Sequence, residues 1–149
     1  YEDASEKYED VISLNATEID YFVRPVWLYI DKLNQPEKAL ELSEKALLHH
    51  PDKAMSYNIL GWSQVANKDY INGRESLEKA LSIQENFDAP YLNLGWMYEQ
   101  QNKFDKAKMY YKKAFETGAG SAIANRAAER YNSLLEKEKN NTFMVNIFN

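Results

Sequence analysis

The chain has 149 residues, 44% of them hydrophobic and 28% charged, which is the composition of a folded domain with a buried core. A net charge of -5 argues against a nucleic-acid interface, which needs a basic stripe, and no apolar run is long enough to span a bilayer. Cysteine is absent, which excludes disulfides, thiol nucleophiles and zinc sites built on thiolates.

The first element, residues 1–19, has Tyr1, Ala4, Tyr8 and Val11 at helical spacing and is similar to the later stretch 104–114. We interpret it as the second helix of an incomplete upstream repeat. Because the chain begins with Tyr1 and shows no leader sequence, we expect the native protein to continue before this residue.

The next three elements are units of equal length, which we place at 20–53, 54–87 and 88–121. Four residues of the second unit recur 34 positions later in the third unit. They are a large residue, a Leu-Gly pair and an aromatic residue: Tyr57, Leu60, Gly61 and Trp62 recur as Tyr91, Leu94, Gly95 and Trp96. Each unit has two apolar stripes of helical period, separated by a short polar turn at 34–36, 67–69 and 101–103. This pattern predicts helical hairpins, and hairpins of this kind must stack to cover their apolar faces.

The first unit departs from the pattern in two places. Pro25 would remove a hydrogen bond inside a helix, so we expect the helix to begin or bend there, with Tyr21 to Arg24 extended. Val26 and Trp27 stand where the later units have Leu-Gly, and the bulk of Trp27 predicts a splayed hairpin or a shifted first helix.

Two elements complete the chain. Residues 122–139 are amphipathic and highly charged, which is typical of a terminal capping helix. Residues 140–149 form an apolar tail with Phe143, Val145, Ile147 and Phe148. Such a tail can fold back, insert into a neighbouring molecule or remain disordered, and we favour docking because it would bury apolar area.

These residues together resemble the tetratricopeptide repeat. The third unit matches best, through Tyr91, Leu94, Gly95, Tyr98, Ala107, Tyr111 and Ala114. The second unit carries Gly73 where the family has alanine, and the first is degenerate. The resemblance implies an all-α fold, a right-handed α-solenoid of stacked helix-turn-helix repeats with a C-terminal capping helix.

The resemblance also implies that the first helix of each hairpin lines a concave groove. The partner-binding residues carried over to this chain are Tyr21, Arg24, Leu28, Asn58, Trp62, Asn93, Trp96, Glu99, Arg126 and Arg130. Trp62 and Trp96 lie one repeat apart and are the strongest candidates, as an aromatic ladder, although both could equally be core residues. Some relatives grip a C-terminal carboxylate, but Leu28, Ile59 and Ala89 replace polar members of that clamp, so the groove is expected to be apolar and aromatic.

Catalysis finds little support in the sequence. His49 and His50 stand at the end of a predicted helix, where a histidine complements the helix dipole. We therefore expect no catalytic residue, no metal and no cofactor, and the sequence indicates no compartment.

The favoured function is a non-catalytic scaffold for a protein or peptide ligand, with no nucleic-acid partner and no direct membrane insertion. One alternative is a homo-oligomerisation module that associates through the N-terminal half-repeat or the C-terminal tail. Another is an accessory region of a larger enzyme.

Overall fold

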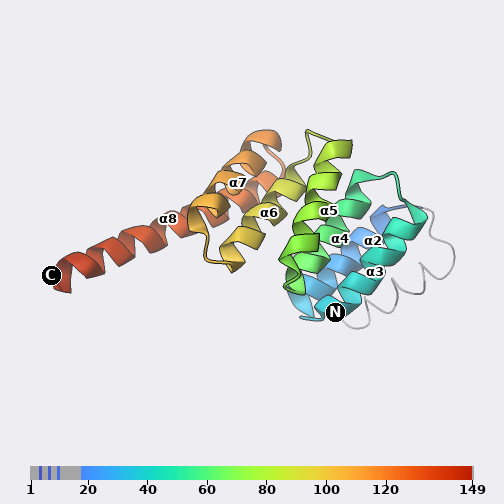
Figure 1. Cartoon of the computed structure of the whole chain (residues 1–149), viewed down its shortest axis with the longest axis horizontal. Coiled ribbons are helices and arrows are strands. Elements are labelled where there is room, and N and C mark those ends of the chain that lie inside the picture. The colour runs from blue at the N-terminus through green and yellow to red at the C-terminus, as the bar shows by residue number, and fades with distance from the viewer. Residues whose placement is uncertain (1–3, 5–6, 8–9, 11–17, 149) are drawn as a thin grey trace. The chain divides into compact units, whose positions relative to one another are not determined.

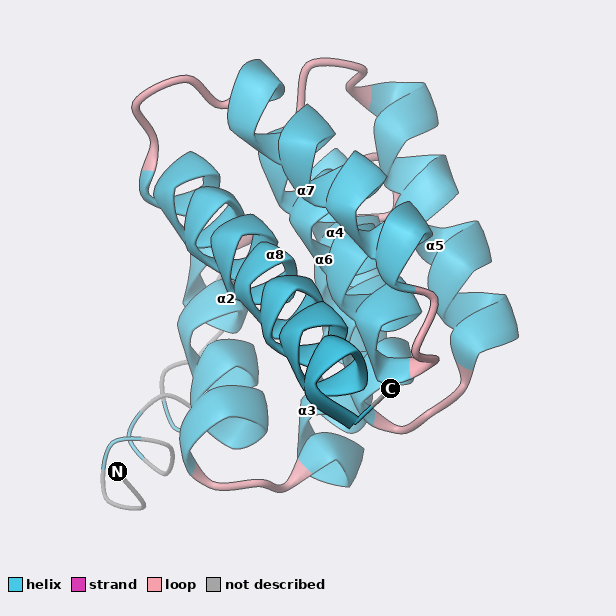
Figure 2. Cartoon of the chain, turned by 90° about the vertical axis from the view of Figure 1, so that its left-hand side faces the viewer, coloured by secondary structure: helices cyan, strands magenta, loops and turns pink. Residues whose placement is uncertain are grey.

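A computed structural model describes residues 4, 7, 10 and 18–148, with side chains up to residue 140. Every regular element in these residues is helical, which confirms the predicted all-α fold class (Figures 1 and 2). The chain divides into two compact units, Tyr1–Glu85 and Asn86–Asn149. The first unit contains α2 (Asp20–Trp27), the π-helical segment η1 (Leu28–Lys32), α3 (Pro36–His49), α4 (Ala54–Ala66) and α5 (Tyr70–Ile83). The second contains α6 (Asp88–Gln100), α7 (Phe104–Thr117) and α8 (Ala122–Phe148). The predicted half-repeat at 1–19 lies largely outside the described residues.

The turns between paired helices share one backbone conformation. Asn34, Lys68 and Asn102 have φ values of 51°, 64° and 57°, so a left-handed residue recurs at the same position of each repeat. A left-handed residue reverses the chain directly after a helix, and asparagine accepts this conformation more readily than most residues. The next helix then begins at once, with Pro36 in the first turn of α3 and the Asp69 carboxylate capping α5.

The core of the first unit joins three helices. Its buried members are Phe22, Val26 and Tyr29 from α2 and η1, Ala39, Leu42 and Ala46 from α3, and Ile59 from α4. Two fully buried serines connect α3 to α4, because the Oγ atoms of Ser43 and Ser63 lie 2.8 Å apart. The Ser43 hydroxyl also lies within hydrogen-bond distance of the Ile59 carbonyl, at 3.2 Å. Pairing of these hydroxyls removes the cost of burying them.

The prediction that Tyr21 to Arg24 are extended is wrong. These residues belong to α2, which begins at Asp20 and contains Pro25. A proline inside a helix costs about 3 kcal/mol, but full burial of Phe22 and Val26 contributes about 1.5–3 kcal/mol for each side chain. Burial therefore outweighs the lost hydrogen bond, and the helix becomes irregular only at η1, directly after Trp27.

The close approach predicted at the Leu-Gly positions is confirmed in both later hairpins. A Cβ atom on Gly61 would lie 2.6 Å from Cγ of Leu77, and one on Gly95 would lie 2.5 Å from the Tyr111 ring. Neither distance is compatible with a real methyl group. Glycine therefore allows α4 to contact α5, and α6 to contact α7, more closely than any other residue could.

The last helix differs from the predicted cap and tail. α8 has 27 residues and continues as one helix through Phe148, past the predicted end of the cap (Figure 1). Whether the apolar tail at 140–149 docks, as we favour, stays a prediction. Nothing is described of the side chains beyond residue 140, which include the apolar ones of the tail.

Candidate partner-binding surface

Two contacts fix how α6 and α8 lie within the second unit. Near the start of both helices, the Ser121 hydroxyl donates a hydrogen bond of 2.6 Å to the Asp88 carboxylate. Further along, the Arg130 guanidinium lies 3.1 Å from the Glu99 carboxylate. The two pairs follow one another in the same order along both helices. The helices therefore run side by side in the same direction, as expected for successive first helices of two repeats.

The Glu99 carboxylate joins three helices. It accepts a hydrogen bond of 2.5 Å from the Tyr111 hydroxyl of α7 and the ion pair from Arg130 of α8. The Tyr111 side chain is fully buried. Burial, together with the hydrogen bond to Glu99, raises the pKa of Tyr111 far above its ordinary value of 10.0, although the positive charge of Arg130 opposes the rise. The phenol therefore stays protonated and remains a donor to Glu99.

Trp96 and Arg126 lie between these two contacts, on α6 and α8 respectively. Trp96 precedes Glu99 by three residues and Arg126 precedes Arg130 by four, so each occupies nearly the same helix face as its paired neighbour. Both side chains are partly exposed. We name Trp96, Glu99, Arg126 and Arg130 the α6–α8 surface. It contains one aromatic ring, one carboxylate and two guanidinium groups, and Arg130 pairs with Glu99.

The remaining predicted residue of this unit, Asn93, is only 7% exposed and offers little surface to a partner. In the first unit, Tyr21 and Arg24 are exposed on α2, whereas Leu28 and Asn58 are buried. Trp62 of α4 is partly buried and packs against the core of Phe22, Val26 and Ile59. That packing favours the core interpretation for this tryptophan.

The predicted site residues thus separate into two groups. Tyr21, Arg24, Leu28, Asn58 and Trp62 belong to the first unit, and Asn93, Trp96, Glu99, Arg126 and Arg130 to the second. The structure brings Glu99 and Arg130 into direct contact, and Trp96 and Arg126 lie on the same two helices. The ladder of Trp62 and Trp96 stays a prediction.

The intramolecular role of Glu99 and Arg130 was not predicted. Arg130 donates to Glu99, which Tyr111 also contacts, and the binding of a ligand by these two residues stays a prediction. One signal was present, since Arg130 lies one full repeat after Trp96 and therefore occupies the next first helix in the same phase. Tyr111 was recognised only as a packing residue of the second helix.

Neither a cluster of metal-binding side chains nor a membrane-spanning helix is found in the described residues. Among them, no group of three or more His, Asp or Glu side chains could hold a metal ion. In the same part of the chain, no helix combines the length and the apolar character that crossing a bilayer requires.

Comparison with known proteins finds one family whose model matches part of the chain. The family model described as "Tetratricopeptide repeat" matches residues 54–87 and 89–117. The crystal structure of MamA is 20% identical over 93% of this chain and 89% of that chain, with a TM-score of 0.57. The MamA RS-1 ArsTM double mutant is 21% identical over 78% of this chain and 65% of that chain, with a TM-score of 0.59. Among curated proteins, no sequence matches the chain significantly. The structural likeness is one of fold, the helical solenoid.

Proposed function

The chain carries tetratricopeptide repeats at 54–87 and 89–117, and on that premise we propose that it is a non-catalytic scaffold that binds a protein or peptide through the α6–α8 surface. Such repeats generally mediate protein–protein interactions and generally lack catalytic activity. The partly exposed Trp96, three residues before Glu99 on the face of α6 that contacts α8, is the observation that carries the proposal. Large aromatic side chains supply much of the binding energy at many protein interfaces.

The chemistry of this surface defines the ligand class. Trp96 offers an apolar platform, and the partly exposed Arg126 and Arg130 add positive charge that attracts a carboxylate. Glu99 pairs with Arg130 at 3.1 Å, which offsets part of that charge. The favoured ligand is therefore a peptide with a large apolar side chain close to an acidic residue.

The test selects ligands on the full chain and then measures their affinity for variants. Peptides chosen from a displayed random library are titrated against the wild-type chain, Trp96→Ala and Arg126→Ala. We expect Trp96→Ala to raise the Kd by roughly tenfold or more, which is typical of an aromatic anchor. Arg126→Ala should weaken the binding of peptides that contain the acidic residue and leave the affinity for the other peptides unchanged.

Met109→Ala is the matched control, because Met109 is 56% exposed on α7 and lies outside the α6–α8 surface. It should bind the selected peptides as the wild type does. Circular dichroism of each variant checks that the fold is retained. Unchanged affinity in Trp96→Ala for every selected peptide would refute the proposal.

A further inference from the structure

The Glu99 carboxylate belongs to the α6–α8 surface but is engaged by the chain itself. Its Oε2 atom accepts a hydrogen bond of 2.5 Å from the Tyr111 hydroxyl and another of 3.1 Å from Nη1 of Arg130. The Glu99 side chain is 18% exposed and that of Arg130 is 33% exposed. A ligand group that reaches the Arg130 guanidinium therefore also meets the negative charge of Glu99.

The repeat itself does not require a carboxylate at this position. One repeat earlier, the equivalent residue is Val65, which is 1% exposed and directs its side chain at Gly73. An apolar side chain thus completes the packing of the α4–α5 hairpin. The charge of Glu99 is a feature that the α6–α7 hairpin has in addition, and it acts on Arg130.

The carboxylate is held more firmly than the guanidinium. Tyr111 is fully buried, and its hydroxyl donates to the same Glu99 oxygen that Arg130 contacts. Arg130 is a longer side chain and is one third exposed. An incoming carboxylate therefore draws Arg130 toward itself, while Glu99 stays in place and repels the new negative charge.

We propose that Glu99 sets the charge selectivity of the α6–α8 surface by competing with an acidic ligand for Arg130. This inference rests on the proposed function, since it concerns a peptide that binds on Trp96. Trp96 precedes Glu99 by three residues and shares its helix face, so the peptide residues next to the anchor lie near the Glu99–Arg130 pair. The wild-type chain then prefers an acidic peptide only modestly over its uncharged analogue.

The experiment compares matched peptides on variants of the full chain. Peptides selected on the wild-type chain are synthesised in pairs, with aspartate or asparagine at each position next to the large apolar residue. The charge preference is the Kd of the asparagine peptide divided by that of the aspartate peptide. Glu99→Gln keeps an oxygen that accepts from Tyr111 but removes the charge, so it should raise this ratio by roughly fivefold at one position or more. The increase should shrink in high salt.

Glu116→Gln removes the same charge at a different place and serves as the control. Glu116 is 61% exposed on α7, where it pairs with Lys112, and it lies outside the α6–α8 surface. Its ratios should equal those of the wild type. A purely structural role of Glu99 would change the affinity for both members of a peptide pair equally, and the ratio would stay constant.

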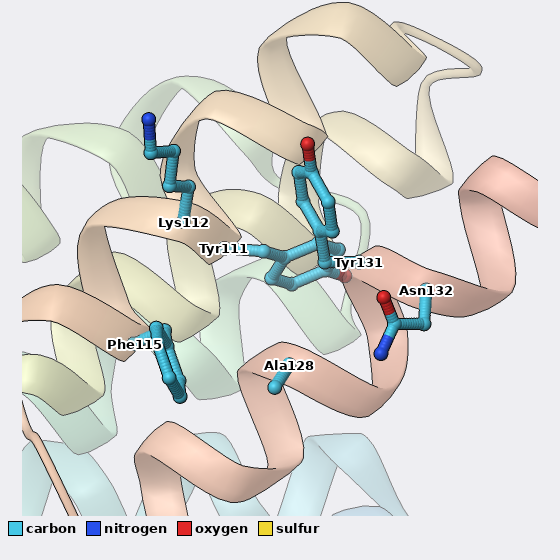
Figure 3. Close-up of a pocket in the computed structure, with 6 residues that line it drawn as sticks. All are labelled: Tyr111, Lys112, Phe115, Ala128, Tyr131 and Asn132. Atoms are coloured by element: carbon cyan, nitrogen blue, oxygen red, sulfur yellow. The ribbon is translucent and has the colours of Figure 1, made fainter.

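A cavity between α7 and α8 has chemistry that attracts similar peptides, so the test must distinguish it from the α6–α8 surface. The cavity has a volume of about 330 Å³ and combines aromatic rings with a lysine (Figure 3). Its lining consists of Tyr111, Lys112, Phe115, Ala128, Tyr131 and Asn132. Phe115 is 48% exposed there, and Phe115→Ala should leave every Kd as in the wild type.

The outcomes separate this inference from the proposed function. If Trp96→Ala does not weaken binding, both are overturned, and weaker binding by Phe115→Ala would place the peptides in the cavity instead. If Trp96→Ala weakens binding but Glu99→Gln leaves every ratio at the wild-type value, only the role of Glu99 is overturned. Circular dichroism of each variant checks that the helices are retained.

Discussion

The α4–α5 and α6–α7 hairpins carry the same repeat pattern but close their interiors with different chemistry. In α4–α5, a Cβ atom on Gly73 would lie 2.8 Å from Cγ2 of Val65 and 3.2 Å from the Gly61 carbonyl oxygen. In α6–α7, Ala107 occupies the position of Gly73 and is fully buried. One hairpin needs two facing glycines, whereas the other needs only Gly95.

The residue at position 65 or 99 explains the difference. Val65 is 1% exposed and directs its branched side chain at Gly73, which leaves no room for a methyl group there. Glu99 holds the equivalent position in the next repeat and reaches to Tyr111 and Arg130 instead. The α6–α7 hairpin is thus tied to α8 through a carboxylate, while the α4–α5 hairpin relies on direct apolar packing. Positions that contact each other within a repeat therefore differ together between the two hairpins.

The largest effect is expected from Gly95→Ala. The new methyl group would collide with the ring of Tyr111, which is fully buried and held by its hydroxyl, so neither partner can move away. Overpacking of this kind should lower the free energy of unfolding by about 2.5 kcal/mol even after the gain in helix propensity. Urea unfolding followed by circular dichroism measures the change. Gln100→Ala, at the exposed end of α6, should differ from wild type by less than about 0.5 kcal/mol. Equal stability of both variants would show that Tyr111 is not fixed.

The second-largest effect is expected from Tyr111→Phe, which should lower the free energy of unfolding by about 1.5 kcal/mol. The substitution removes a hydrogen bond to a charged acceptor while keeping the ring. Its effect should depend on pH. The pKa of Tyr111 is raised in the folded state, so this group's contribution is fully present below pH 10 and is lost as the pH rises further. Between about pH 9 and 11, the stability difference between wild type and Tyr111→Phe should therefore shrink. Urea titrations across that range measure it, and a difference that grows with pH would contradict the assignment.

Gly73→Ala should have the smallest effect and lower the free energy of unfolding by about 1 kcal/mol. The clash of the new methyl group with Val65 is partly offset by the higher helix propensity of alanine. Combined with Val65→Ala, the same substitution should be neutral or stabilising relative to Val65→Ala alone. In a double-mutant cycle of wild type, the two single variants and the double variant, we expect a coupling free energy of about 1 kcal/mol between the two sites. Strict additivity would mean that the backbone of Gly61, and not Val65, requires the glycine.

Much of the architecture could be predicted from the residues because it depends on local spacing. Gly61 and Gly95, each one residue after a leucine, mark where paired helices touch, and the polar triplets at 67–69 and 101–103 mark the turns. These features return at a fixed period, so each repeat supports the interpretation of the next. Helix periodicity and turn chemistry act over a few residues and can be read without knowing any distant contact.

Where the prediction was wrong or incomplete, a distant contact decided the outcome. Pro25 lies inside a helix because burial of its neighbours in the core outweighs its local cost. Arg130 pairs with Glu99 because α6 and α8 lie side by side, which no spacing within one helix reveals. The sequence by itself determined the repeat, its period and its all-helical class. Only the tertiary structure decided which charged and aromatic side chains remain available to a partner, because availability depends on what the rest of the chain already occupies.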